Sequence, residues 1–162
     1  MVDEATFHDL VADLNYPMVV ATTVADGERS GCLVGFTTQC SIKPPRFLVF
    51  ISKKNHTFGV ASRADHIAVH FLSHEHLELS KVFGELTGDE VDKFERVRWH
   101  WSETGLPVLD DCPTWFVGRI VDRLDGGDHL GFVLEIVEAE KGERVAPLGF
   151  QEVRDMQPGH PA

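Results

Sequence analysis

The chain lacks an excess of basic residues, and this excludes several functional classes. It carries 15 Lys and Arg against 26 Asp and Glu over 162 residues, for a formal net charge of -11. Proteins that bind nucleic acid or anionic lipid need clustered basic side chains to pair with phosphates. The acidic balance therefore predicts no nucleic-acid partner.

Long apolar runs are also missing. No run approaches the roughly 20 residues of a membrane span. The N-terminal segment is acidic and lacks the basic start and apolar centre of a signal peptide. We therefore expect no membrane partner and a soluble, cytoplasmic protein. The length and the 43% hydrophobic content predict a single domain over residues 1–156 and a flexible C-terminal tail over residues 157–162.

Cysteine is scarce, with Cys32, Cys40 and Cys112 as its three occurrences. An odd number cannot pair completely within one chain, and no CxxC spacing occurs. We expect these residues to be small and buried, as free cysteines usually are. A reactive thiol is the alternative for Cys40, because it lies in a polar connection.

Sequence signatures of several enzyme classes are absent. There is no GxGxxG, no GxxxxGK[ST] and no GxSxG, so a Rossmann site, a P-loop and a hydrolase nucleophile are not indicated. Nine histidines raise the question of a metal. His66 and His70 fall in a β-type segment, where they would lie about 13 Å apart, too far to share one ion. We expect no metal site.

Hydrophobic patterns predict a mainly β fold with inserted helices. Residues 3–14 have one apolar helical face, which we expect to pack on the body, and Ala25 to Glu28 supply an Asp-Gly turn for a hairpin between 18–24 and 30–36. Strands alternating irregularly with helices favour an antiparallel barrel. Further strands are expected at 47–51, 66–72, 115–124 and 130–139, helices at 58–63, at 75–83 and from Asp89, and irregular chain at 99–113.

The stretch from Gly31 to Thr57 joins two apolar runs by a hydroxyl-rich connection and ends in a cationic, polar segment. Small polar side chains beside a strand exit suit a flat polar heterocycle with a phosphate tail. Alternatively, the hydroxyls satisfy a strand edge, and Lys53 and Lys54 form a solvated turn. The residues alone leave both interpretations open.

His129 follows Gly126 and Gly127 in the connection between the last two long strands. Glycines allow a tight turn, which would leave an imidazole able to donate or accept a proton near neutral pH at the mouth of a barrel. The alternative is an exposed histidine without a role.

Taken in order, these segments resemble the flavin reductase-like family. The resemblance runs over roughly residues 18 to 148, and its parts are individually weak but occur in the family's order. They are Gly31, the run from Phe36 to Pro45, the strand exit from Ser52 to Thr57, the segments 69–73, 93–94 and 105–109, and Gly127-Asp128-His129.

The resemblance implies an antiparallel split β-barrel of the FMN-binding type. It implies FMN as cofactor, with FAD possible, and NADH or NADPH as co-substrate. By the same resemblance His129 lies beside the nicotinamide. The residues implied at the flavin are Thr37, Thr38, Cys40, Ser41, Ser52, Lys53, Asn55 and Thr57.

The resemblance further implies a homodimer and a flavin-dependent monooxygenase component that receives reduced flavin. The implied activity is NAD(P)H-dependent reduction of flavin. The chain departs from the family pattern in the first loop, where Gly35 and Thr37 replace a small hydroxyl residue and an aromatic and Phe36 is offset by one. At the strand exit Asn55 replaces a serine, and residues 147–154 lack the family's glycine-aromatic ending. The alternative function is therefore a non-catalytic flavin-binding or ligand-binding split barrel.

Overall fold

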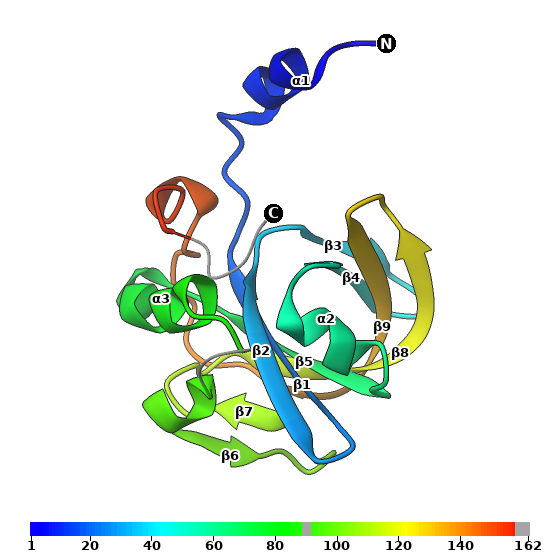
Figure 1. The fold of residues 1–162 in the computed structure, drawn as a ribbon. Helices are drawn as coiled ribbons and strands as arrows, with labels where there is room; N and C mark the ends of the chain where they lie inside the picture. Colours follow the sequence, from blue (N-terminus) through cyan, green and yellow to red (C-terminus); the bar gives the residue numbers. More distant parts are fainter. Residues whose placement is uncertain (89–91, 158–162) are drawn as a thin grey trace.

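A computed structural model describes residues 1–88 and 92–157. Its longer elements are strands, with short helices placed between them (Figure 1). The elements are α1 (Glu4–Val11), β1 (Val19–Ala25), β2 (Glu28–Val34), β3 (Thr37–Ser41), β4 (Arg46–Ser52), α2 (His56–Ala61), β5 (His66–Phe71), η1 (His74–His76), α3 (Leu77–Glu85), η2 (Lys93–Arg96), β6 (Trp99–Trp101), β7 (Pro107–Leu109), β8 (Trp115–Asp125), β9 (His129–Glu140) and η3 (Phe150–Glu152).

Within the described residues, seven strands form one antiparallel sheet in the order β2-β1-β5-β8-β9-β4-β3, and β6 pairs with β7. The outermost strands, β2 and β3, are separated in the chain by only Gly35 and Phe36. The three Cα–Cα steps from the end of β2 to the start of β3 cover at most about 11 Å. The sheet must therefore curl until its two edges meet, and Figure 1 shows this curl.

The line where the two edges meet, between the ends of β2 and β4, is called the seam below. There the Phe50 N–H donates to the Phe36 carbonyl at 2.9 Å. Helix α2 packs against β1, β2 and β4 and so covers the opening of the curled sheet (Figure 1). The core inside the curl is apolar, with Val19, Ile51 and Phe132 at most 2% exposed.

The hairpin between β1 and β2 confirms the predicted Asp-Gly turn. Asp26 has φ 52° and Gly27 has φ 78°. Two consecutive positive φ angles match the type I′ turn, whose twist suits the flanking strands. The turn thereby sets the register in which Val19 pairs with Val34.

The mainly β fold with inserted helices is confirmed, but three local predictions are wrong. Residues 99–113 contain the β6–β7 hairpin, because Trp99 and Trp101 form a strand where glycine and proline indicated irregular chain. Helix α2 begins at His56 and is capped by Asn55, whose side chain accepts the Thr57 N–H. The helix expected from Asp89 would start outside the described residues; the described chain that follows contains the short 3₁₀-helix η2.

Helix α1 is the third difference. Asp3 caps it as expected, accepting the Thr6 N–H at 2.8 Å, but the helix has no buried residue. It stands away from the body in Figure 1 instead of packing on it. Its exit is fixed by Gln151, whose amide donates to Ala12 and Leu14 carbonyls at 2.9 and 2.7 Å. None of the described helices is long and apolar enough to cross a membrane.

A buried histidine ties the small β6–β7 hairpin to the large sheet. His70 is 0% exposed. Its Nδ1 lies 2.9 Å from the Val20 carbonyl, and its Nε2 accepts the Leu109 N–H at 3.1 Å. Because Nε2 accepts, the ring proton is on Nδ1 and donates to Val20. Burial lowers the pKa of His70 to about 4, since the charged imidazole would lose its hydration.

Protonation of His70 should make the fold less stable in mild acid. The unfolded chain takes up this proton near pH 6.5 and the folded chain only near pH 4, so the stabilisation is complete above pH 6.5 and is lost as the pH falls to 4. The loss attributable to His70 is about 3 kcal/mol. Urea unfolding at several pH values should show a shallower acid decline for His70→Gln than for wild type. His66→Asn, on the same strand and partly exposed, is the control, and parallel curves for H70Q and wild type would contradict the assignment.

Candidate functional site

A cavity of about 200 Å³ lies at the seam. Its walls come from the ends of β2 and β4, the Gly35-Phe36 link and the first residue of β9, which the curl of the sheet brings together. Most of its side chains are apolar or aromatic, and a few are polar. The lining residues are Tyr16, Met18, Cys32, Leu33, Val34, Gly35, Phe36, Phe50, Ile51, Ser52, Asn55, His129 and Phe150.

A row of aromatic rings forms one wall of this seam cavity. The Tyr16 ring packs edge-on against Phe36 at 5.5 Å and against Phe150 at 6.0 Å. Phe36 continues the row to the His129 ring at 5.1 Å. Apolar and aromatic walls with a few polar groups are typical of sites for small molecules.

His129 is held at the cavity mouth by the residue before it. Its Nδ1 lies 2.7 Å from the Asp128 carboxylate, and this hydrogen bond lowers the pKa of Asp128. A carboxylate only accepts, so the proton is on Nδ1. Within residues 1–88 and 92–157, Nε2 makes no hydrogen bond. It can therefore exchange a proton or a hydrogen bond with a ligand.

The turn that carries His129 is anchored to the end of β4. The Lys53 N–H donates to the Asp128 carbonyl at 2.9 Å. The Lys53 ammonium lies 2.8 Å from Asp125 Oδ1, which also accepts the Gly127 N–H. These bonds lower the pKa of Asp125. The turn needs Gly127, whose φ is 123°.

The structure brings some of the sequence-predicted site residues together and leaves others apart. Ser52, Asn55 and His129 line the seam cavity. The four expected residues on β3 do not line it. That strand is the edge of the sheet. Thr38 and Cys40 are exposed, and Thr37 and Ser41, at its two ends, are partly buried.

Thr57 is buried and has a partner inside the fold. It is 1% exposed, and its hydroxyl lies 2.7 Å from the Ser30 hydroxyl. This pair joins α2 to β2 beside Cys32, whose thiol pKa is raised by burial. The expected burial is confirmed for Cys32 and Cys112, whereas Cys40 is exposed.

Sequence reasoning missed the aromatic part of the site. Tyr16 and Phe150 are more than 130 positions apart in the chain, and no local pattern joins them. They meet because Phe150 N–H donates to the Tyr16 carbonyl at 2.7 Å. Phe50 lies in an apolar strand that looks uniformly buried. Of these aromatic residues, only Phe36 stood out in the sequence, because it is offset by one position from the aromatic of the family pattern.

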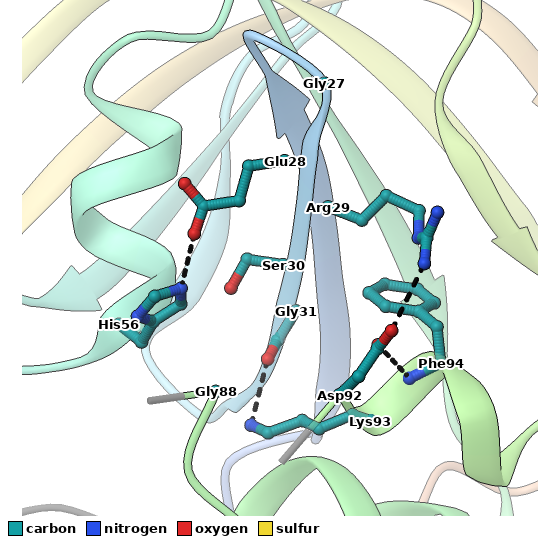
Figure 2. A pocket seen from close by; sticks show the side chains of 10 residues that line it. All are labelled: Gly27, Glu28, Arg29, Ser30, Gly31, His56, Gly88, Asp92, Lys93 and Phe94. Carbon is teal, nitrogen blue, oxygen red and sulfur yellow. Dashed lines mark hydrogen bonds and ion pairs between the residues drawn. The ribbon is translucent and has the colours of Figure 1, made fainter. Parts of the chain in front are cut away.

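A second hollow, of about 400 Å³, lies outside the barrel at the free edge of β2 (Figure 2). Its charged groups are paired with one another. Glu28 bonds to His56 at 2.8 Å, and Arg29 bonds to Asp92 at 3.2 Å. Lys93 donates to the Gly31 carbonyl at 3.0 Å. These contacts hold the hairpin against α2 and η2.

Lys93 is the most buried cation of this hollow, at 5% exposure. Its ammonium also donates to the Phe83 carbonyl at 3.0 Å, and burial lowers its pKa. The hollow is bordered by Gly88 and Asp92, and the three residues between them lie outside the described part of the chain. Among the described residues, no group of three His, Cys, Asp or Glu is placed to hold a metal ion.

The fold is a split β-barrel, and a partly aromatic cavity lies at its seam. The family model described as "Flavin reductase like domain" matches residues 11–158. That match covers most of the 162 residues. The chain belongs to the flavin reductase-like family.

Similar proteins of described activity agree with this family assignment. The reductase component of 4-nitrophenol 4-monooxygenase/4-nitrocatechol 2-monooxygenase from Rhodococcus opacus is 30% identical over 140 residues, covering 86% of this chain and 74% of the relative. FMN reductase (NADH) RutF of Bradyrhizobium diazoefficiens is 31% identical over 124 residues, covering 76% and 68%. The crystal structure of a flavin reductase domain protein from Arthrobacter sp. FB24 shares the fold, with TM-score 0.84, 24% identity and coverage of 99% and 96%.

The residues at the seam fit a flavin. The aromatic lining suits a heterocyclic ring; the Ser52 hydroxyl can donate to a ring carbonyl or nitrogen, and His129 Nε2 can accept a hydrogen bond. Gly35 leaves the backbone close to Met18, since an added Cβ would lie 3.3 Å from the Met18 sulfur. A larger side chain there would narrow the cavity.

Thr57→Val tests whether this hydroxyl serves the fold. The change should lower the free energy of unfolding by about 1–3 kcal/mol, because it leaves the buried Ser30 hydroxyl without its partner. Urea denaturation measures this. The double variant Ser30→Ala/Thr57→Val should recover part of the loss. Unchanged stability together with weakened FMN binding would instead make Thr57 a ligand contact.

Proposed function

We propose that this chain is an NAD(P)H-dependent flavin reductase, with FMN as the flavin and FAD as a possible substitute. The observation that carries the proposal is the seam cavity, which joins an aromatic wall to Ser52, Asn55 and His129 in a member of the flavin reductase-like family. The relative named FMN reductase (NADH) supports the choice of FMN and of a nicotinamide donor.

The bound flavin would supply the electron-accepting ring, which takes a hydride from NADH or NADPH. The protein's own contribution is placement and electrostatics. Asp128 holds His129 by its Nδ1, which leaves Nε2 to orient the nicotinamide or its carboxamide at the cavity mouth. The rings of Tyr16, Phe36 and Phe150 keep water from one side of the cavity.

Lys53 remains a proposed phosphate contact together with Asn55. Its ammonium is bound to Asp125, so a flavin phosphate would have to replace or share this carboxylate. The roles proposed for Thr37, Thr38, Cys40 and Ser41 depend on backbone or side-chain contacts along β3, outside the cavity itself. Thr57 supports the phosphate end by holding α2 to β2.

The direct test is to mix the purified protein with FMN and either nicotinamide. Oxidation of NADH or NADPH that requires FMN is the expected result. Absence of both flavin binding and turnover would refute the proposal. Tight flavin retention without turnover would favour the alternative, a non-catalytic flavin-binding barrel.

We further propose that reduced flavin passes to a monooxygenase component, as the name of the Rhodococcus relative suggests.

His129→Ala should lower kcat/KM for NAD(P)H roughly tenfold or more, the cost of losing one hydrogen bond to a polar or charged group. The Kd for FMN, measured by quenching of flavin fluorescence, should change less than twofold. The matched control is His100→Ala, since His100 forms a similar Nδ1–carboxylate pair with Asp110 at 2.6 Å on the surface. An equal loss of FMN binding and turnover would show that His129 is structural.

We also propose a homodimer, because α1 and the turn after it leave an apolar face uncovered. Phe7, Leu10 and Leu14 are 56%, 73% and 49% exposed. A helix of 8 residues is marginal without packing, and clustered exposed apolar side chains mark interaction sites. A second copy of this chain would cover the face.

Sedimentation analysis should find two chains per particle for the wild type. Phe7→Ser/Leu10→Ser should raise the dimer dissociation constant at least tenfold, because it removes two apolar contacts of about 1.5–3 kcal/mol each. Asp9→Ser on the same helix is the control and should leave the dimer intact. A monomeric wild type, or a double variant that dimerises as tightly as the wild type, would contradict this.

A further inference from the structure

Two separate hollows meet at the seam. The seam cavity of about 200 Å³ lies on one side, and an outer hollow of about 260 Å³ lies on the other. Both are lined by Phe36, Phe50 and His129, and the outer one also by Gly126 and Asp128. Ligand sites usually measure roughly 300–1,000 Å³. Each hollow alone is below this range, and the two joined would fall within it.

The shared wall contains one ring that is poorly held. Phe36 is 48% exposed, whereas Tyr16, Phe50 and Phe150 are half-buried. Its ring makes two angled aromatic contacts, with interplanar angles of 51° to His129 and 70° to Tyr16. Each such pair is worth about 0.5–1.5 kcal/mol, so the two together are worth about 1–3 kcal/mol. An exposed ring can therefore leave this position at small cost, on the nanosecond scale of side-chain rotation.

The backbone of Phe36 is fixed while its ring is free to turn. Its carbonyl accepts the Phe50 N–H across the seam, so the link itself cannot move without opening the barrel. Gly35 before it carries no side chain that would hinder rotation. Movement of the ring alone is the change that joins the two hollows.

We propose that Phe36 is a gating residue that competes with the flavin for the face of His129. In the ligand-free protein its ring covers His129 and divides the site, and a planar ligand must displace it. This deepens the proposed function on which it rests, because it names the side chain that a flavin must move aside to enter the site. The apparent Kd for FMN is then the Kd of the open form divided by the fraction of molecules in which the gate is open.

Phe36→Ala should open the site permanently. We expect the Kd for FMN to fall about 5- to 150-fold, the factor that corresponds to losing the two aromatic pairs of Phe36. The association rate, measured by stopped-flow quenching of flavin fluorescence, should rise by a similar factor. Phe36→Tyr keeps the ring and should behave like the wild type. Trp101→Ala removes a 52% exposed ring on β6 that lines neither hollow; it is the matched control and should leave the association rate unchanged.

Several outcomes would overturn the gate. Weaker binding by Phe36→Ala would make Phe36 a stacking platform, and an unchanged Kd and association rate would give it no role. Phe36→Leu fills the position without a flat ring and should repeat the result if the alanine variant folds poorly. A wild type that binds no FMN refutes the proposed function and the gate together. Flavin binding with unaltered F36A kinetics refutes the gate alone.

Discussion

The two-residue link between β2 and β3 is the constraint on which the rest of the structure depends. These strands stand at opposite edges of the sheet, yet Gly35 and Phe36 are all that joins them. Curling is therefore a geometric necessity, and the bond between Phe50 and Phe36 completes it. Backbone that turns between two edges cannot be fully covered by the sheet. The same link that closes the barrel thus leaves a hollow at its seam.

This arrangement explains why the site draws on distant parts of the chain. The curl places Ser52 opposite His129 in register at the β4–β9 end. The segment before β1 and the one after β9 cross the same end, where Pro17 bridges to Gly149. Residues from the whole chain length therefore meet around a short link. Aromatic side chains fill this meeting point because large rings cover the most seam for the fewest residues.

Local signals predicted the strands and the hairpins, but not which polar side chains face a ligand. Period-two patterns and the Asp26-Gly27 turn depend only on neighbouring residues, so they were readable. Which hydroxyl groups face the cavity and which bond inside the fold could not be predicted from local patterns. Thr57 looked like a phosphate contact, and it pairs with Ser30 inside the fold. Glycines marked the turn that carries His129 to the cavity mouth, whereas Tyr16 could be placed only by tertiary contacts.

The electrostatics of the seam also favour loose binding over tight retention. The Lys53 ammonium is already paired with Asp125, whose side chain is 67% exposed. A phosphate that takes the place of this carboxylate exchanges one exposed ion pair for another, and such pairs contribute only about 0–1 kcal/mol. The net charge of -11 adds a long-range repulsion for an anionic flavin. Both features lower the affinity for an anionic ligand, which would suit the proposed transfer of reduced flavin to a monooxygenase component.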